Sequence, residues 1–80
     1  MKARIFVTLK PGVLDPQGQA IQGALAALGF DGVAAVRQGK VFDIELTDAS
    51  EAETRLDRMC AALLANTVIE DYRVELGDGA

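Results

Sequence analysis

Few residues of this chain could do chemistry, and their types exclude most enzyme mechanisms. The 80 residues include no histidine and only one cysteine. Without histidine the chain has no imidazole for acid–base catalysis or metal binding, and one cysteine cannot form a thiolate zinc site. Neither a phosphate-binding P-loop nor a G-x-G-x-x-G sequence is present. The composition therefore favours a domain that binds or organises other molecules and is not itself a catalyst.

The charged residues with the most restricted setting lie in the sequence K-P-G-V-L-D-P-Q-G, which begins at Lys10. Pro11 cannot donate a backbone hydrogen bond to a sheet, so a strand should end near Lys10. Asp15 is expected to cap a helix whose first residue is Pro16. Such a loop would hold Lys10, Gly12 and Asp15 in one fixed geometry. It either serves the fold alone or contacts a partner.

Two further groups of polar residues follow along the chain. Arg37 and Lys40 flank the expected tip of a β-hairpin, where they form either a solvated turn or part of a binding surface. Glu70 and Asp71 are neighbours in an expected strand, so their side chains point to opposite faces and cannot form a paired-carboxylate site. Tyr72 is expected to pack, with its hydroxyl reaching water or a polar neighbour.

Bulk composition narrows the class of partner. The formal net charge is −4 and no run of lysines or arginines exists, which argues against nucleic acid or an anionic membrane surface. Hydrophobic residues make up 50% of the chain, which suggests apolar surface buried against another chain. Neither a membrane span nor an export signal is indicated, and a single cysteine suits a reducing cytoplasm. That residue, Cys60, is expected to be a buried structural thiol.

Hydrophobic periodicity predicts the secondary structure. Alternating apolar residues indicate strands, and i, i+3, i+4, i+7 spacing indicates helices. The expected elements are a strand ending near residue 10, a helix over 16–28, strands over 33–38 and 40–46, a helix ending near residue 65, and a strand over 68–76. Gln38 and Gly39 would form the two-residue turn of a hairpin between the middle strands.

The second expected helix has signals at both ends. It would begin at a capping box, formed either by Asp48 with Glu51 or by Ser50 with Glu53. Asn66 would take a left-handed conformation where the helix ends. The buried stripe of this helix is predicted to consist of Ala52, Leu56, Met59 and Leu63.

The element order is β-α-β-β-α-β, with no linker, so residues 1–80 are expected to form a single domain. We predict an α+β two-layer sandwich in which two helices pack on one face of a four-stranded antiparallel sheet. The other face would carry Phe6 and Ile69 among polar residues. Because the core of such a small domain is marginal and its sheet edges are open, the chain should be at least a dimer.

Three segments resemble the PurS family in order and in spacing. They are K-P-G-V-L-D-P-Q-G-Q-A-I from Lys10 to Ile21, V-R-Q-G-K-V-F from Val36 to Phe42, and L-L-A-N-T-V-I-E-D-Y from Leu63 to Tyr72. The resemblance covers essentially the whole chain, and the first and third motifs are specific to this family. One departure is Thr67, where the family usually has proline, and this changes the stiffness of the helix exit.

The resemblance implies a PurS-like fold, related to ferredoxin-like folds, and a role in phosphoribosylformylglycinamidine (FGAM) synthase of de novo purine biosynthesis. This ATP-dependent amidoligase converts formylglycinamide ribonucleotide, ATP and glutamine to FGAM, ADP, phosphate and glutamate. In the family, PurQ releases ammonia from glutamine, and PurL carries the synthetase site, where ATP and Mg are expected. PurS is implied to be a non-catalytic small subunit without a cofactor, which bridges PurQ and PurL as a dimer or larger assembly and aids ammonia transfer.

Residues of the matching motifs that the core does not need are the candidates for contacts with PurL or PurQ. They are Lys10, Gly12, Asp15, Arg37, Lys40, Asn66, Glu70, Asp71 and Tyr72. No catalytic, cofactor-binding or metal-binding residue is predicted. An alternative is an ACT-type regulatory domain, which shares this length and element order and binds small molecules, although the chain lacks a convincing glycine-rich effector loop of that type.

Overall fold

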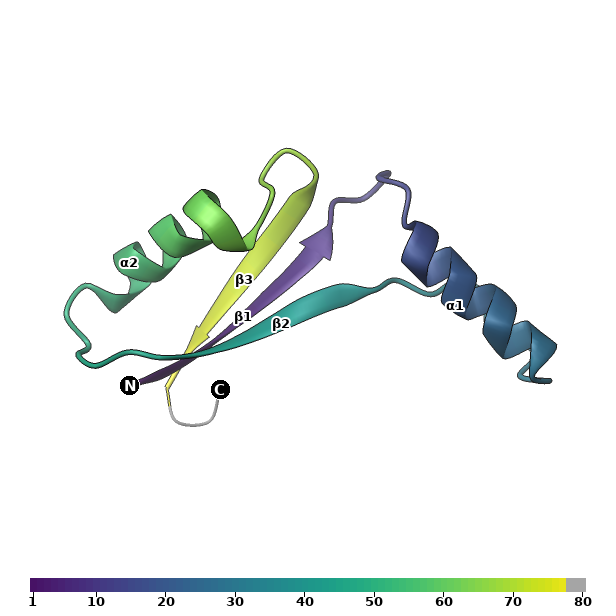
Figure 1. The fold of residues 1–80 in the computed structure, drawn as a ribbon, viewed down its shortest axis with the longest axis horizontal. Coiled ribbons are helices and arrows are strands. Elements are labelled where there is room, and N and C mark those ends of the chain that lie inside the picture. Colours follow the sequence, from purple (N-terminus) through teal and green to yellow (C-terminus); the bar gives the residue numbers. More distant parts are fainter. Residues whose placement is uncertain (78–80) are drawn as a thin grey trace.

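The computed structural model describes residues 1–77, and Figure 1 shows the arrangement of its elements. They are β1 (Lys2–Leu9), α1 (Pro16–Ala27), β2 (Gly39–Glu45), α2 (Ala52–Met59), the π-helical turn η1 (Cys60–Leu64) and β3 (Glu70–Leu76). The α+β class is as predicted. The molecule is elongated, with principal extents of 49 × 28 × 14 Å.

A three-stranded antiparallel sheet, in the order β2-β1-β3, forms the body of the fold. The alternating sequence of β1 gives it one continuous apolar face, on which Ala3, Ile5 and Val7 are all buried. Ile5 lies opposite Phe42 of β2 on one side and Val74 of β3 on the other. Because burial of one large aliphatic side chain contributes roughly 1.5–3 kcal/mol, this face anchors the core.

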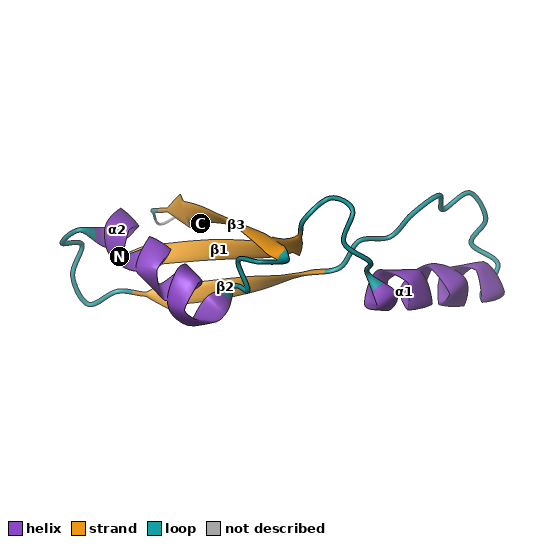
Figure 2. Ribbon diagram, turned by 90° about the horizontal axis from the view of Figure 1, so that it is seen from above, coloured by secondary structure: helices purple, strands orange, loops and turns teal. Residues whose placement is uncertain are grey.

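The helix α2 and the turn η1 cover the apolar face of the sheet (Figure 2). Ala52, Leu56 and Cys60 are buried there. The sequence predicted that this stripe continues to Leu63, but Leu63 is 84% exposed. The reason is the wide π turn, in which the amide of Ala65 donates to the carbonyl of Cys60 (2.9 Å) and the extra residue rotates Leu63 toward solvent.

The start and the end of the second helical segment also differ from the prediction. Neither expected capping box forms, because the N-cap is Glu51, which has a φ of 50° and makes no side-chain cap. Asp48 instead accepts hydrogen bonds from the Ser50 amide (2.9 Å) and the Arg55 guanidinium (3.1 Å), which fix the preceding turn. Among the described residues Glu51 is the only non-glycine with positive φ, so Asn66 does not adopt the expected left-handed conformation.

The expected hairpin does not form, and the sheet has three strands where four were predicted. Residues 33–38 belong to no strand, and β2 pairs with β1 from Gly39 onward. Gly39 has no positive φ and is not a turn residue. A Cβ atom at Gly39 would lie 2.6 Å from the carbonyl oxygen of Val7. The glycine is therefore required by the close approach of two strands and not by a turn.

Residues 16–36, which we call the arm, extend beyond one end of the sheet (Figures 1 and 2). The helix α1 forms where periodicity predicts it, with Asp15 as its N-cap and Pro16 as its first residue. The prediction that it packs on the sheet face is wrong, because the chain after β1 turns away from that face. The apolar side chains of the arm are consequently uncovered by their own chain: Leu28 is 73% exposed and Phe30 60%.

Candidate functional site at the junction of sheet and arm

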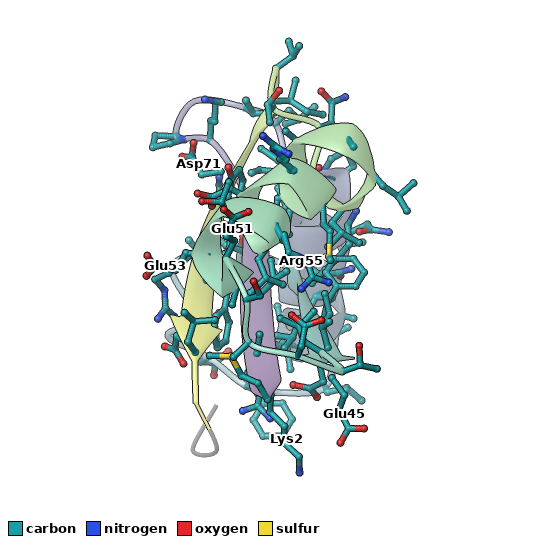
Figure 3. All side chains as sticks on the ribbon, turned by 90° about the vertical axis from the view of Figure 1, so that its left-hand side faces the viewer. Lys2, Glu45, Glu51, Glu53, Arg55 and Asp71 are labelled. Carbon is teal, nitrogen blue, oxygen red and sulfur yellow. The ribbon has the colours of Figure 1, made fainter. Side chains whose placement is uncertain are left out.

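The candidate residues from the sequence, with one exception, gather at the end of the sheet from which the arm leaves. The register places the end of β1 beside the starts of β2 and β3, with Thr8 opposite both Gly39 and Asp71. Figure 3 shows Asp71 toward this end and Lys2 and Glu45 at the other. We call this region the junction and define it as residues 10–15, 37–40 and 66–71.

The junction begins with a tight turn formed by Lys10, Pro11, Gly12 and Val13. The amide of Val13 donates to the carbonyl of Lys10 (3.1 Å), and Gly12 has a φ of 85°. These features match a type II turn, which favours proline at its second position and needs positive φ at its third. The amide of Lys10 donates to the carbonyl of Ile69 (2.9 Å), which fixes the base of the turn to the end of the sheet.

Asp15 is the one buried polar side chain among the described residues, at 6% exposure. Its Oδ1 accepts a hydrogen bond from the amide of Gly18 (2.8 Å), and its Oδ2 accepts one from the amide of Gln38 (2.8 Å). The hydrogen bond from Gln38 and then that from Gly18 lower the pKa of Asp15, and the charge of Arg37 adds to them against the opposing effect of burial. The carboxylate therefore ties the start of α1 to the returning chain.

Arg37, on the returning chain, also joins it to the outgoing chain. Its Nη2 donates to the carbonyls of Leu9 (3.1 Å) and Lys10 (3.2 Å), and its Nη1 donates to the carbonyl of Val13 (3.4 Å). The side chain predicted to flank a hairpin tip thus binds the type II turn of its own chain, while remaining exposed to solvent.

Two ion pairs flank the end of the sheet. Lys10 Nζ lies 3.2 Å from Asp71 Oδ1, and Lys40 Nζ lies 3.6 Å from Glu70 Oε2. Glu70 also accepts a hydrogen bond from the amide of Asn66 through Oε1 (2.7 Å). The carboxylates of Glu70 and Asp71 therefore bind different lysines and do not act as a pair. The Lys10–Asp71 pair is exposed, and exposed ion pairs contribute about 0–1 kcal/mol to stability. In the second pair the side chain of Glu70 is only 12% exposed.

Tyr72 is the candidate that lies away from the junction. It is opposite Val7 on the sheet face that α2 covers, and it packs against the core. Burial raises the pKa of the Tyr72 phenol, and the nearby Asp57 and Cys60 raise it further. The tyrosine is partly buried and packs against the core, as the sequence predicted.

The sequence did not indicate two features of this region. Asp15 caps the helix through the amide of Gly18 as predicted, but it also binds the backbone amide of Gln38, for which the sequence carries no side-chain signal. Leu14 and Val68 are large apolar residues of the junction that remain exposed. Their exposure follows from the tertiary arrangement, which periodicity does not encode.

The junction offers ion pairs and hydrogen bonds but no reactive group of its own. In the part of the chain that the structure describes, no cluster of three or more histidine, cysteine, aspartate or glutamate side chains could hold a metal. Cys60 is fully buried, and burial raises the pKa of its thiol. None of the helices described is long and apolar enough to span a membrane. The arrangement is suited to fixing the arm and to binding another protein.

Comparison with known sequences gives one consistent family. The chain matches the PurS family model, phosphoribosylformylglycinamidine (FGAM) synthase, over residues 2–78. It is 53% identical over 75 residues to phosphoribosylformylglycinamidine synthase subunit PurS of Synechocystis sp., a match that covers 91% of this chain and 75% of that protein. It is 43% identical over 76 residues to subunit PurS of Bacillus subtilis, covering 94% of this chain and 90% of the relative.

Solved structures extend this similarity to the fold. B. subtilis PurS has a TM-score of 0.89 at 42% identity, covering 96% of this chain and 98% of that one. A chain of PurLQS from Thermotoga maritima has a TM-score of 0.76 at 30% identity, covering 92% of this chain and 93% of that one. Coverage this high includes the arm as well as the sheet. The chain therefore belongs to the PurS family of phosphoribosylformylglycinamidine synthase subunits.

Proposed function

We propose that this chain is the non-catalytic subunit that holds PurL and PurQ together in FGAM synthase. The observation that carries this proposal is its similarity to a chain of PurLQS from T. maritima over 92% of its length. The absence of histidine and of a P-loop from the sequence supports a non-catalytic role. Glutamine hydrolysis then belongs to PurQ and ATP- and Mg-dependent synthesis to PurL. This chain aids the passage of ammonia between them, in the cytoplasm.

The proposed partner of the arm is a second copy of this chain. On the apolar face of the sheet α2 packs against β3, while Phe42 and Ile44 on the same face of β2 remain only half-buried. This uncovered strip lies where the second helix of a two-layer sandwich belongs. An arm from another copy, with Ile21, Leu28 and Phe30 exposed, has the apolar surface to cover it. Self-association would thus bury both surfaces at once.

Reconstitution of the enzyme tests the proposed function. The purified chain is mixed with its cognate PurL and PurQ, and glutamine-dependent formation of FGAM and ADP is measured. Synthesis should need all three proteins, and this chain alone should hydrolyse neither glutamine nor ATP, because it lacks a nucleophile–base pair and a phosphate-binding loop. Full activity of PurL with PurQ alone, or glutaminase activity of the isolated chain, would contradict the proposal.

The lysines of the junction test where PurL or PurQ binds. Combining Lys10→Ala with Lys40→Ala removes two ion pairs at the sheet end, and it should leave the chain folded while weakening the complex. Lys2→Ala with Arg58→Ala removes the same charge elsewhere and serves as the control. Undiminished complex formation by the junction variant at every salt concentration would exclude this surface.

A further inference from the structure

We propose that Asp15 and Arg37 act together as a positioning device that sets the direction in which the arm leaves the sheet. This direction decides whether the exposed apolar residues of the arm can reach a second chain. The second step rests on the proposed self-association, whereas the first concerns the isolated chain alone.

The arm is attached to the sheet by only two chain segments. Residues 10–15 lead out of β1 into α1, and residues 37–38 lead back into β2. The arm lies beyond the end of the sheet, so packing of α1 on the sheet does not fix its orientation. If the two segments were not connected to each other, they would form a hinge, because changes in a few backbone dihedral angles could swing the whole arm.

Hydrogen bonds in both directions tie the two segments together. The outgoing segment supplies the Asp15 carboxylate, which accepts from the Gln38 amide of the returning segment (2.8 Å). The returning segment supplies the Arg37 guanidinium, which donates to carbonyls of Leu9, Lys10 and Val13. Because the Gln38 amide and the carbonyls lie on different segments, rotation at the hinge would break several bonds together.

The Asp15 carboxylate cannot be replaced by a neutral amide of the same shape. Each of its oxygens accepts a different backbone amide, that of Gly18 at 2.8 Å and that of Gln38 at 2.8 Å. Asparagine has one acceptor oxygen and an NH₂ group that only donates. An Asp15→Asn substitution therefore leaves one buried amide facing another donor, which opens the connection.

Gly18 provides independent, steric evidence that the outgoing and returning segments lie close together. A Cβ atom at Gly18 would lie 2.3 Å from the carbonyl oxygen of Val36 and 2.7 Å from Asp15 Oδ2. The same atom at Gly23, in the same helix, would meet nothing within 4 Å. Of these two glycines of α1, only Gly18, where the outgoing and returning segments cross, is required by space. Gly18→Ala should therefore push the segments apart without changing any charge.

Pulsed electron–electron double resonance tests the orientation of the arm directly. Spin labels are attached to cysteines replacing Ala26 on the arm and Glu53 on α2, in a Cys60→Ala chain diluted with unlabelled chain. The distance distribution should be at least twofold broader with Asp15→Asn and with Gly18→Ala than in the parent chain. Circular dichroism should show the sheet intact in every variant.

Two matched substitutions control for helix propensity and charge. Gly23→Ala repeats the glycine change in open space, and Asp31→Asn repeats the charge change on the exposed tip of the arm. Both should keep the narrow distribution and the parental dissociation constant for self-association, while Asp15→Asn and Gly18→Ala weaken association at least tenfold. A distribution as narrow as the parent's in both junction variants overturns the proposal. A parent chain that does not self-associate contradicts only the proposed oligomer, since the distance measurement still decides the positioning.

Discussion

Gly39 marks a position where the sheet has no room for a side chain. A Cβ atom there would approach the backbone carbonyl of Val7 to 2.6 Å, and that carbonyl cannot move without disturbing the central strand. Gly39→Ala should therefore lower the free energy of unfolding by roughly 1–3 kcal/mol. Gly23→Ala is the control, because the added methyl group meets nothing within 4 Å and improves helix propensity by about 1 kcal/mol. Urea unfolding of both variants measures the difference, and an unchanged midpoint for Gly39→Ala would contradict it.

The low pKa of Asp15 predicts how the junction responds to acid. Hydrogen bonds from Gln38 and Gly18 lower this pKa below its ordinary value of 3.8, so the folded chain releases the proton more readily than the unfolded chain. The stability that Asp15 contributes is complete above the ordinary value and is lost as the pH falls through the lowered one. The difference in unfolding free energy between the parent and Asp15→Asn should be constant from about pH 5 upward. This difference should shrink in stronger acid. A difference that grows on acidification would contradict a lowered pKa of Asp15.

Cys60 is expected to be structural at every pH at which the chain is folded. Burial raises the pKa of its thiol above 9.0, so the unfolded chain ionises first and folding stability declines as the pH rises past that value. The native chain should resist thiol reagents that modify the urea-unfolded chain at once. Cys60→Ala should cost about 1 kcal/mol of stability and leave FGAM synthesis intact. Loss of synthesis in a folded variant would reveal a role for the thiol.

At the scale of the elements, two leucines of the segment from α2 through η1 differ sharply in burial. Leu56 is fully buried, whereas Leu63, seven residues later on the same predicted helical stripe, is 84% exposed because the π turn intervenes. Leu56→Ala should lower the free energy of unfolding by about 2–5 kcal/mol. Leu63→Ala should change it by less than about 0.5 kcal/mol. Equal losses in thermal or urea unfolding would mean that the α-helical register continues to Leu63.

Local signals predicted the elements better than their partners. The end of β1 and the start of α1 could be predicted, because Pro11, Asp15 and Pro16 act only on the backbone within a few residues of themselves. The apolar alternation of residues 33–38 predicted a strand, but alternation does not say whether a segment finds a pairing partner, and these residues belong to no strand. The sequence therefore predicted a hairpin that the structure lacks.

In the candidate site, too, local features could be predicted and long-range contacts could not. The motifs identified most residues of the junction, because the proline- and glycine-rich loop and the charged residues are visible in the sequence. The bond between Asp15 and Gln38 was not predictable, since it joins residues 23 positions apart through a backbone amide that has no side-chain signature. Arg37 was a candidate for contact with a partner, and nothing in the sequence indicated that its guanidinium, still exposed, also donates to carbonyls of its own chain.

On the scale of the whole molecule, the chain is much less compact than most domains of its length. The radius of gyration is 15.8 Å, against about 12 Å for a compact domain of this length. The isolated chain should therefore sediment at micromolar concentration as a dimer or a larger species, because the exposed apolar arm is stabilised by burial. Phe30→Ser, at a position 60% exposed on the arm, should weaken this association without unfolding the sheet. A stable monomer at that concentration would contradict the expectation.

The arm is also, in topological terms, the loop of a β-hairpin, since β1 and β2 are antiparallel neighbours joined by residues 10–38. Closing so long a loop costs about 2 kcal/mol more conformational entropy than closing a two-residue turn. The helix α1 and the hydrogen bond from Gln38 to Asp15 shorten the effective loop, because they hold its two ends close together. Pairing of β1 with β2 can then begin at Thr8 and Gly39 and proceed toward Lys2 and Glu45. The segment that reaches outward in the folded protein would thus guide strand pairing during folding.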